Sequence, residues 1–413
     1  MRLNLFCADI CKKYGIENEA HNYAKYEDAS YADISSVISK EVFEHFLFER
    51  SKAKIIRESV SVELPVRVNF CGSPSDAAPY CLEHGGTMID GALILNGKKP
   101  IKVLARKIPE KIIRFGSIDQ NCNASFTEIN EIQSCTNPYD PYALHKAVLI
   151  AIGVIPKNTE NCSLQTLCEQ YGGGIELLTE VDVPKGSSLG TSSIIAAAAV
   201  KAVNEFFGIS VSNEMIYSQV FLVEQLMTTG GGWQDQVGGL TTGIKYFTAL
   251  PGIYQNIKVE RLELSEETKM ELNERFCLIF SGQRRLARNV LREEMNKCIR
   301  NDKQAMQTIK TIQEYCAIMR FYLLKGDVTS FAQYITRQFE LVKILDKGAS
   351  NTCIEYIFDV CEDLLDGKSV CGAGGGGFLQ VILKKGITKT TLKERIQKNF
   401  GDCGVALWDC ELI

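Results

Sequence analysis

The chain is too long to fold around a single hydrophobic core, and this sets the first limit on its architecture. It has 413 residues, whereas single cores stop growing at about 250–300 residues. Two domains are therefore expected. The sequence shows no proline-rich linker, internal repeat or low-complexity tract at which one domain would visibly end.

Apolar spacing predicts a helical start, a strand-rich section and a mostly helical second half. Residues 1–60 are expected to be helical, notably "SVISKEVFEHFLFERSKAKII", where apolar residues recur every three or four positions. Strands begin at Ser61 with "SVELPVRVNFCG" and continue through "TMIDGALILNG" and "PIKVLARKI". Further on we expect helices at "DPYALHKAVLIAIGV" and "NEMIYSQVFLVEQLM", a loop at "TTGGGWQDQVGG", and strands at "GIKYFTAL" and "RFCLIFSG" before a run of long helices.

Charge and composition argue against several classes of function. A net charge of −4 and a pI near 5.8 give no overall attraction to nucleic acid or acidic lipid, so small molecules are the expected partners. No apolar run is long enough to cross a bilayer, and "MRLNLFCADICKKYG" is a poor signal peptide, which predicts a cytoplasmic protein. The 16 cysteines lack paired C-x-x-C spacing and the 4 histidines lie far apart, so neither disulfides nor a zinc site are expected.

The segment "PKGSSLGTSSIIAAAAV", residues 184–200, links a strand to a helix through small residues. Four positions carry little or no side chain, namely Gly186, Ser187, Ser188 and Gly190. Successive amides there can all point at one anion, and a helix starting near Thr191 would add its free amides and positive dipole end. One of the helix's first hydroxyl groups could also hold a magnesium ion bound to phosphates. The alternative is an ordinary capped helix after a turn.

A second glycine-rich segment, "GAGGGG" at residues 372–377, satisfies the letters of the dinucleotide fingerprint G-x-G-x-x-G. That fingerprint must follow a strand and open a helix, but the following "FLQVIL" is strand-like. A Walker A sequence is also missing, because "GKS" at Gly367 lacks a glycine five positions earlier. The segment instead predicts a close backbone approach, either to another part of the chain or to a ligand.

Four charged residues are candidates for chemistry. Asp235 lies in the glycine-dense "GGGWQDQVGG", and Glu224 lies eleven positions earlier in the apolar helix "VFLVEQLM". Beside a phosphate loop, one carboxylate for a metal and another for the acceptor proton is what phosphoryl transfer to an alcohol requires. Arg67 and Asp76 bracket "VNFCGSPS", where they could steady a carboxylate and grip sugar hydroxyls. Their alternatives are an amphipathic boundary for Glu224 and surface charges at a strand end for Arg67 and Asp76.

The segment "SGQRRLARNVLREE" carries a cluster of arginines, namely Arg284, Arg285, Arg288 and Arg292. A nucleic-acid stripe is one interpretation, but the chain has no overall basic charge and the segment has no interleaved aromatic residues. A solvated helix face paired with nearby glutamates is the favoured interpretation.

Three segments, in this order, resemble the GHMP small-molecule kinases, the superfamily of galactokinase, homoserine kinase, mevalonate kinase and phosphomevalonate kinase. The motif P-x-R-V-N-x-x-G with a following aspartate is similar to residues 65–76, and P-x-G-x-G-L-G-S-S is similar to residues 184–192, with Thr191 for the first serine. The third motif is similar to the 372–377 loop, and the resemblance covers roughly residues 61–413. Within the superfamily "PYCLEHGGTMIDGALILNG", "GGGWQDQVGGLTTGIKY" and "FSGQRRLARNVL" look most like fucokinases, and heptose-phosphate kinases are somewhat less similar.

This resemblance implies an α/β (α+β) fold of two domains, residues 61–245 and 246–413, with the active site in the interdomain cleft and residues 1–60 as an extension. It also implies ATP and Mg²⁺ as cofactors and a sugar as substrate. The residues implied for the nucleotide phosphates are Pro184, Gly186, Ser187, Ser188, Leu189, Gly190, Thr191 and Ser192. Those implied for the reaction are Asp235 as the base beside the sugar hydroxyl, Arg67 as its electrostatic partner, Ser192 and Glu224 for Mg²⁺, and Asp76, Gly374, Gly375 and Gly376 for the substrate.

Two departures from the family pattern bear on the substrate. Ser188 stands where the family usually has glycine, and Ser73 and Pro74 replace the glycine and tryptophan of the fucokinase-like G-G-W-S-D. The leading hypothesis is a kinase that phosphorylates the anomeric hydroxyl of L-fucose, and it is expected to be monofunctional because a 60-residue extension is below the usual domain size. The alternatives are a kinase for heptose 7-phosphate or another sugar phosphate, docked by the arginines at 284–292, and a catalytically weak sugar or nucleotide sensor. The sequence neither indicates nor excludes a homo-oligomer.

Overall fold

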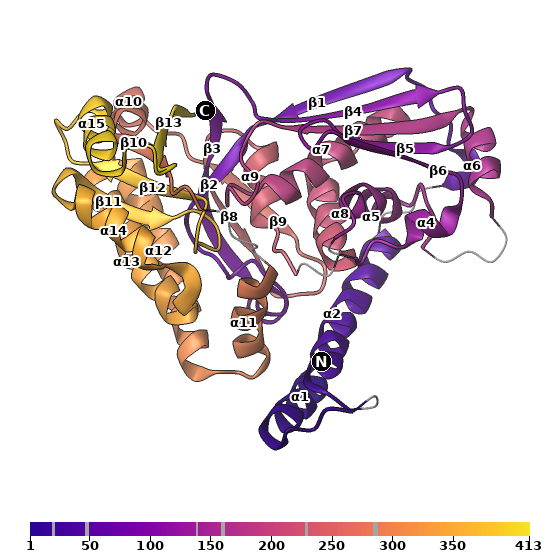
Figure 1. Cartoon of the computed structure of the whole chain (residues 1–413), viewed down its shortest axis with the longest axis horizontal. Helices are drawn as coiled ribbons and strands as arrows, with labels where there is room; N and C mark the ends of the chain where they lie inside the picture. Colours follow the sequence, from indigo (N-terminus) through magenta and orange to yellow (C-terminus); the bar gives the residue numbers. More distant parts are fainter. Residues whose placement is uncertain (19–20, 46–48, 138, 158–161, 228–229, 284–287) are drawn as a thin grey trace.

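The computed structural model of the chain consists of three sheets with helices packed on them (Figure 1). It describes residues 1–18, 21–45, 49–137, 139–157, 162–227, 230–283 and 288–413. Within these ranges no helix combines the length and the hydropathy needed to cross a membrane. The mixture of helices and sheets confirms the predicted α/β (α+β) class.

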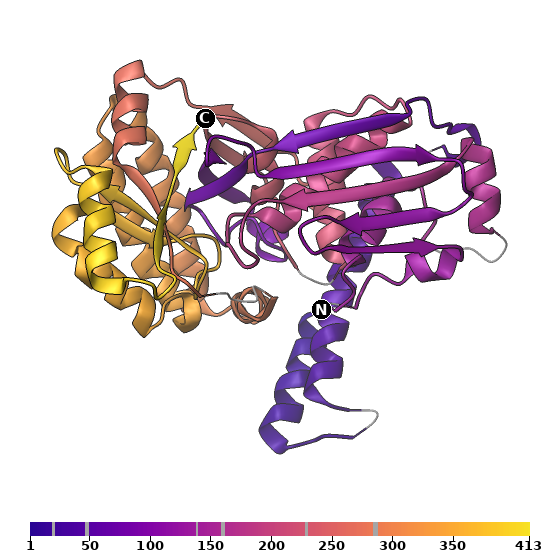
Figure 2. The ribbon, with the colours of Figure 1, turned by 45° about the horizontal axis from the view of Figure 1, so that its top comes forward.

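The first sheet lies in the half built from the earlier part of the chain (Figure 2). Its strands are, in spatial order, β1 (Ser59–Leu64), β4 (Ile101–Ile108), β7 (Gly174–Val181), β5 (Ile113–Ser117) and β6 (Cys122–Phe126). Only the β5–β7 pair is parallel. The residues of β1 alternate between exposed and buried, because one face of the sheet meets solvent and the other carries helices.

Helix α7 (Thr191–Phe206) covers the buried face of this sheet and starts where the glycine- and serine-rich loop ends. Its alanines, Ala196 to Ala199, are completely buried. Alanine favours helix and has a small side chain, so α7 can lie close to the strands. Other helices of this half are α3 (Tyr80–His84), α4 (Ile129–Gln133), α5 (Ala143–Ile152), α6 (Leu164–Tyr171) and α8 (Asn213–Leu226).

The middle sheet contains strands from both ends of the sequence. It is built of β2 (Val66–Cys71), β3 (Gly86–Leu95), β8 (Ile244–Ala249), β9 (Ile257–Arg261) and β14 (Cys410–Leu412). Strand β3 pairs with β2, β8 and β14, so residues more than 300 positions apart lie side by side. The domain boundary predicted at residue 245 falls within β8, and the division of the chain there stays a prediction.

The third sheet is entirely antiparallel and belongs to the later half of the chain. Its strands are, in order, β11 (Leu365–Val370), β12 (Phe378–Leu383), β10 (Phe276–Phe280) and β13 (Ala406–Trp408). Around it lie α10 (Glu266–Arg275), α12 (Lys303–Lys325), α13 (Val328–Leu345), α14 (Thr352–Cys361) and α15 (Lys389–Phe400). Strand β12 follows the second glycine-rich segment directly, as the sequence predicts.

The N-terminal extension is helical as far as His45, where α1 (Arg2–Tyr14) and α2 (Tyr23–His45) form a hairpin that projects from the body (Figure 1). The helix predicted on to residue 60 is wrong for its last part, because residues 50–52 form only a 3-10 turn and residues 53–57 are irregular before β1 begins at Ser59. Helix α2 packs on α8, and α1 contacts α11 (Arg288–Ile299). Arg300, just after α11, donates to Asp9 of α1 through Nε at 2.8 Å. The hairpin therefore contacts helices from both halves of the chain.

The segment "TTGGGWQDQVGG" differs from its prediction as a loop, because residues 234–240 form helix α9 (Gln234–Leu240). Glycine disfavours helix in isolation. Here Gly238 and Gly239 face neighbours so close that added Cβ atoms would lie 2.6 Å from Arg67 Cβ and 2.7 Å from Ile194 Cγ2. Packing against β2 and α7 therefore holds a helix that local propensity does not predict.

Candidate active site

Arg67 connects the small-residue loop to Asp235. Strand β2 buries Arg67 to 3% exposure. Its Nε donates to Asp235 Oδ1 at 2.8 Å, and its Nη1 donates to the carbonyl oxygen of Ser188 at 2.9 Å. A Cβ added at Gly190 would lie 3.0 Å from Asp235 Cγ and 3.1 Å from Arg67 Nε. Three elements predicted separately from the sequence therefore meet at one point.

Burial and charge act in opposite directions on Arg67. Removal from water lowers the pKa of its guanidinium, but the charge and hydrogen bond of Asp235 and the charge of Asp90 raise it, and the net direction is upward. The guanidinium is therefore a permanent cation beside the Asp235 carboxylate.

The backbone of the loop alternates in and out of the left-handed region. Gly186, Ser188 and Gly190 have φ values of 72°, 64° and 75°. Such alternation is the pattern that forms anion-binding nests of backbone amides. Leu189 is fully buried and anchors the loop in the core. Ser188, the departure from the family glycine, adopts the left-handed conformation in spite of its Cβ, at a cost on the order of 1 kcal/mol or more.

The second glycine-rich segment packs directly on this loop. Phe378 donates its amide to the carbonyl oxygen of Ser187 at 3.0 Å. A Cβ at Gly377 would lie 2.5 Å from the carbonyl oxygen of Gly186, and one at Gly372 would lie 2.7 Å from that of Ser188. For these two glycines, the close approach predicted from the sequence is therefore to another part of the chain.

The neighbouring Gly374 and Gly375 approach a different backbone. A Cβ at Gly374 would lie 2.4 Å from the carbonyl oxygen of Ala349, which also accepts the Gly375 amide at 2.7 Å. Gly376 has a φ of 156°. The substrate role of Gly374, Gly375 and Gly376 stays a prediction.

Glu224 of α8 contacts the first turn of α7 through its side chain, as a phosphate-linked metal site would require. Its side chain is 4% exposed and accepts a 2.6 Å hydrogen bond from Ser193 Oγ. A Cβ at Gly231 would lie 2.8 Å from Glu224 Oε2. The predicted metal ligand Ser192 is exposed, and its neighbour Ser193 is the serine that bonds Glu224. The metal role of Ser192 stays a prediction. The sequence-based prediction named Ser192, and nothing in the sequence separates this serine from Ser193.

Asp76 is buried against the residues that precede Asp235. Its Oδ2 accepts the Gln234 amide at 3.1 Å, and a Cβ at Gly232 would lie 1.9 Å from it. Burial, and next the nearby Asp235 carboxylate, raise the pKa of Asp76 to about 7, against the lowering effect of the Gln234 hydrogen bond and of Arg67. A run of glycines, Gly231 and Gly232, thus touches Glu224 and Asp76 in turn.

Two polar residues without an assigned role from the sequence complete this region. Asn69 donates to the Gln234 side chain, and Gln234 Nε2 donates to Ser73 Oγ at 3.4 Å. The only sign in the sequence that Asn69 has a functional role is its place in the first motif. Gln234 precedes Asp235 by one position in a glycine-rich segment, and nothing in the sequence indicated a role for it.

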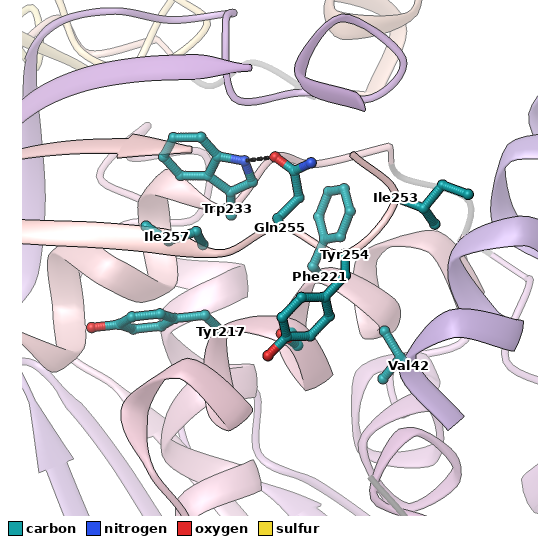
Figure 3. A pocket seen from close by; sticks show the side chains of 9 residues that line it. Val42, Tyr217, Phe221, Trp233, Ile253, Tyr254, Gln255 and Ile257 are labelled. Carbon is teal, nitrogen blue, oxygen red and sulfur yellow. Dashed lines mark hydrogen bonds between the residues drawn. The ribbon is translucent and has the colours of Figure 1, made fainter. Parts of the chain in front are cut away.

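Trp233 fixes the other side of this segment (Figure 3). It is completely buried, and its indole Nε1 donates to Gln255 Oε1 at 3.1 Å. A cavity of about 10 Å³, about the size of one water molecule, lies among Trp233, Phe221, Tyr217 and Val42 of α2. The N-terminal hairpin therefore reaches the packing behind the Asp235 segment.

A larger cavity of about 390 Å³ opens where the small-residue loop begins. It is lined by residues 181–185 and Asp119 from the earlier half and by Trp408 from the later half. The predicted nucleotide residue Pro184 is part of its wall. Polar and apolar side chains of the earlier half and the aromatic Trp408 of the later half thus border one opening next to the loop.

The predicted arginine docking cluster is outside what the structure describes. Arg284 and Arg285 lie beyond the described residues, and the side chains of Arg288 and Arg292 in α11 are not described either.

The fold is that of the GHMP small-molecule kinases. Residues 158–243, which include the loop, Glu224 and Asp235, match the family model "GHMP kinases N terminal domain". The structure is also similar to Lactococcus lactis galactokinase complexed with galactose, with a TM-score of 0.62, 12% identity, and coverage of 91% of this chain and 97% of the galactokinase. The chain therefore carries a GHMP kinase N-terminal domain within a fold of the GHMP kinase type.

Curated relatives make the resemblance more specific. The chain is 33% identical to the bifunctional fucokinase/GDP-fucose pyrophosphorylase of Arabidopsis thaliana, over 82% of this chain and 31% of the relative, so it spans about a third of that protein's length. It is 24% identical to the D-glycero-alpha-D-manno-heptose 7-phosphate kinase of Campylobacter jejuni, over 78% of this chain and 88% of that kinase.

Proposed function

We propose that this protein uses ATP and Mg²⁺ to phosphorylate the anomeric hydroxyl of L-fucose. The observation that carries the proposal is the Arg67–Asp235 pair, which lies against Gly190 at the end of the small-residue loop. An acid next to a phosphate loop is the arrangement that transfer to an alcohol requires. The fucokinase named in the Arabidopsis relative supports fucose as the acceptor.

The residues present fit a magnesium nucleotide. The left-handed backbone at three loop positions forms a concave row that favours anions, and α7 begins directly after it. Glu224 and the exposed hydroxyl of Ser192 supply the hard oxygen ligands that Mg²⁺ prefers. Ser193 would hold Glu224 in place through the 2.6 Å hydrogen bond.

The cavity of about 390 Å³ at Pro184 supports a place for the nucleoside of ATP. It adjoins the first residue of the loop, so a nucleotide with its phosphates on the loop would extend its base toward Trp408. An aromatic ring and apolar residues at the entrance are suited to bind the flat face of a base.

The chain's own side chains would orient the acceptor. Asp76 and Asp235 lie close enough for their charges to interact, and both would accept or share hydrogen bonds with sugar hydroxyls. MgATP supplies the phosphoryl group, whose transfer forms an O–P bond at the sugar and breaks the P–O bond to ADP. Asp235 would receive the hydroxyl proton, with Arg67 holding its carboxylate in place.

A panel of sugars with ADP release as the readout tests the proposal. The full chain should release ADP with L-fucose and MgATP, and the product should be labile to acid as an anomeric phosphate. Asp235→Asn is the matched control, since it keeps the size of the side chain. If no free hexose or deoxyhexose raises ADP release above the Asp235→Asn background, the proposal is wrong.

The heptose 7-phosphate kinase relative favours a second candidate, a kinase for a phosphorylated sugar. That function predicts turnover only with sugars that already carry a phosphate. The same panel therefore includes sugar phosphates. Binding of MgATP without turnover on either set of sugars would instead support a sensor.

A further inference from the structure

A row of polar side chains crosses the middle sheet beneath α9. Asn69 of β2 pairs with Asp90 of β3, and Asp90 pairs with Lys245 of β8. Directly paired residues point to the same face of a sheet, and Arg67 points to this face as well because it lies two positions from Asn69. A central strand covered by helices is normally apolar on both faces. The polar row is therefore unusual where it stands.

Asp90 and Lys245 form a completely buried ion pair. Both side chains are 0% exposed, and Lys245 Nζ lies 2.9 Å from Asp90 Oδ1. Lys245 Nζ also donates to the carbonyl oxygens of Gly243 at 3.0 Å and of Gly238 at 3.4 Å. Taking two charges out of water costs about as much as their attraction returns, so stability alone does not explain such a pair.

Asp90 lies beside the side chain that holds Asp235. A Cβ at Gly238 of α9 would be 2.6 Å from Arg67 Cβ and 2.6 Å from Asp90 Oδ2, so Arg67 and Asp90 meet under the same helical turn. The Arg67 cation thus has two carboxylates within reach of its field, Asp90 and Asp235. Only Asp235 receives its hydrogen bond from Nε.

We propose that Lys245 is a positioning residue: by neutralising Asp90 it leaves the Arg67 guanidinium bonded to Asp235 instead of drawn toward Asp90. The proposal rests on the proposed function, in which the Arg67–Asp235 pair serves the sugar hydroxyl. Burial raises the pKa of Asp90 even though the charge and hydrogen bond of Lys245 lower it. Without Lys245, Asp90 remains a carboxylate only through the field of the neighbouring Arg67 cation, which is then attracted to it. Loss of Lys245 would therefore pull Arg67 away from Asp235 without any direct contact with substrate.

The test compares Lys245→Met in two backgrounds of the full chain, with Asp90 and with Asp90→Asn. Lys146→Met is the matched control, because Lys146 also forms a mostly buried ion pair, at 2.7 Å with Asp140, on α5. The first readout is the Arg67 Nε–H signal in ¹⁵N-arginine spectra, assigned by its loss in Arg67→Lys. The second is kcat and KM for L-fucose and ATP, measured where circular dichroism shows each variant to be folded.

With Asp90 present, Lys245→Met should lower kcat by roughly tenfold or more, leave KM for ATP within about twofold, and shift the Arg67 Nε–H signal or speed its exchange. In the Asp90→Asn background the same change should cost less than about threefold, because the competing carboxylate is gone. Lys146→Met should leave the Arg67 signal unchanged.

An equal kcat loss from Lys245→Met in both backgrounds, or a folded Lys245→Met variant with an unchanged Arg67 signal, would overturn the proposal. If the Lys245→Met variant does not fold, the test compares Asp90→Asn with the double variant Asp90→Asn/Lys245→Met. A tenfold loss of kcat between these two would contradict the proposal. The Arg67 signal needs no turnover. If the chain phosphorylates no sugar, the proposed function is refuted. The Arg67 spectra would still test whether Lys245 holds Arg67 at Asp235.

Discussion

Arg67 and Asp235 are 168 positions apart in the chain, yet Arg67 Nε donates to Asp235 Oδ1 at 2.8 Å. The same guanidinium donates to the Ser188 carbonyl oxygen, so one side chain fixes the acid and the loop relative to each other. In the proposed function, the fold of β2 would thereby set the distance between a phosphate on the loop and an acceptor near Asp235. The Arg67–Asp235 pair therefore fixes the geometry of the candidate site.

Asp235→Asn should abolish most of the turnover and spare binding. The amide keeps the shape but cannot accept the hydroxyl proton as a carboxylate does, so kcat should fall by about 10²-fold or more. The Kd of MgATP, measured by calorimetry, should change little. A variant that loses nucleotide binding together with kcat would show that Asp235 supports the loop rather than the acceptor.

Gly190→Ala should impair both folding and turnover. The added Cβ would lie 3.0 Å from Asp235 Cγ, and the backbone φ of 75° is strained for any residue with a Cβ. Thermal unfolding should report a loss on the order of 1–3 kcal/mol, and kcat should fall because Arg67 and Asp235 must shift away from the added Cβ. Gly97→Ala is the matched control, since it has a φ of 74° and no atom within 4 Å of the added Cβ. Equal losses of kcat in the two variants would contradict the prediction.

Asp76→Asn should stabilise the protein relative to wild type as the pH rises. The pKa of Asp76 is about 7 in the folded chain and 3.8 is its ordinary value, so between these values the folded state holds a proton that the unfolded state has released. The contribution of protonated Asp76 to the free energy of unfolding is therefore fully present below about pH 4 and is lost as the pH rises through 7. Asparagine does not titrate.

The measurement is the difference in the free energy of unfolding between Asp76→Asn and wild type at pH 5 and pH 8. All other titrating groups largely cancel in that difference. It should shift in favour of Asp76→Asn at pH 8. A difference that is constant with pH, or that shifts the other way, would mean that Asp76 is not held protonated by its burial.

Ser192→Ala and Ser193→Ala should have different effects although the two serines are adjacent. Ser193→Ala removes the 2.6 Å hydrogen bond to buried Glu224 and should cost about 1–3 kcal/mol in the free energy of unfolding. Ser192 is exposed, so Ser192→Ala should leave stability unchanged and raise the Mg²⁺ concentration needed for half-maximal activity. An unchanged Mg²⁺ requirement in Ser192→Ala would remove that residue from the metal site.

Local patterns predicted the pieces of the site but not their partners. The left-handed loop and the helix that follows it were predictable because both depend on nearest neighbours, and the strand after "GAGGGG" was predictable for the same reason. Helix α9 could not be predicted in this way, because its glycines are helical only where they pack against Arg67 and Ile194 of other elements. The choice of Ser193 over Ser192 for Glu224 depends on how α7 is turned against α8, which no single segment encodes.

By itself the sequence determined which residue types stand in which order: small residues before a helix start, an arginine in an apolar strand, and an acid within a glycine run. Order along the chain fixes backbone freedom and charge, because these are properties of each residue and its neighbours. Only the tertiary structure decided which residues pair. Arg67 donates a hydrogen bond to Asp235, Gly372 and Gly377 pack against the loop, and Lys245 forms an ion pair with Asp90 in the core. Those pairings cross 100 to 200 positions of sequence, and they form because packing and burial act between elements, where spacing along the chain carries no information.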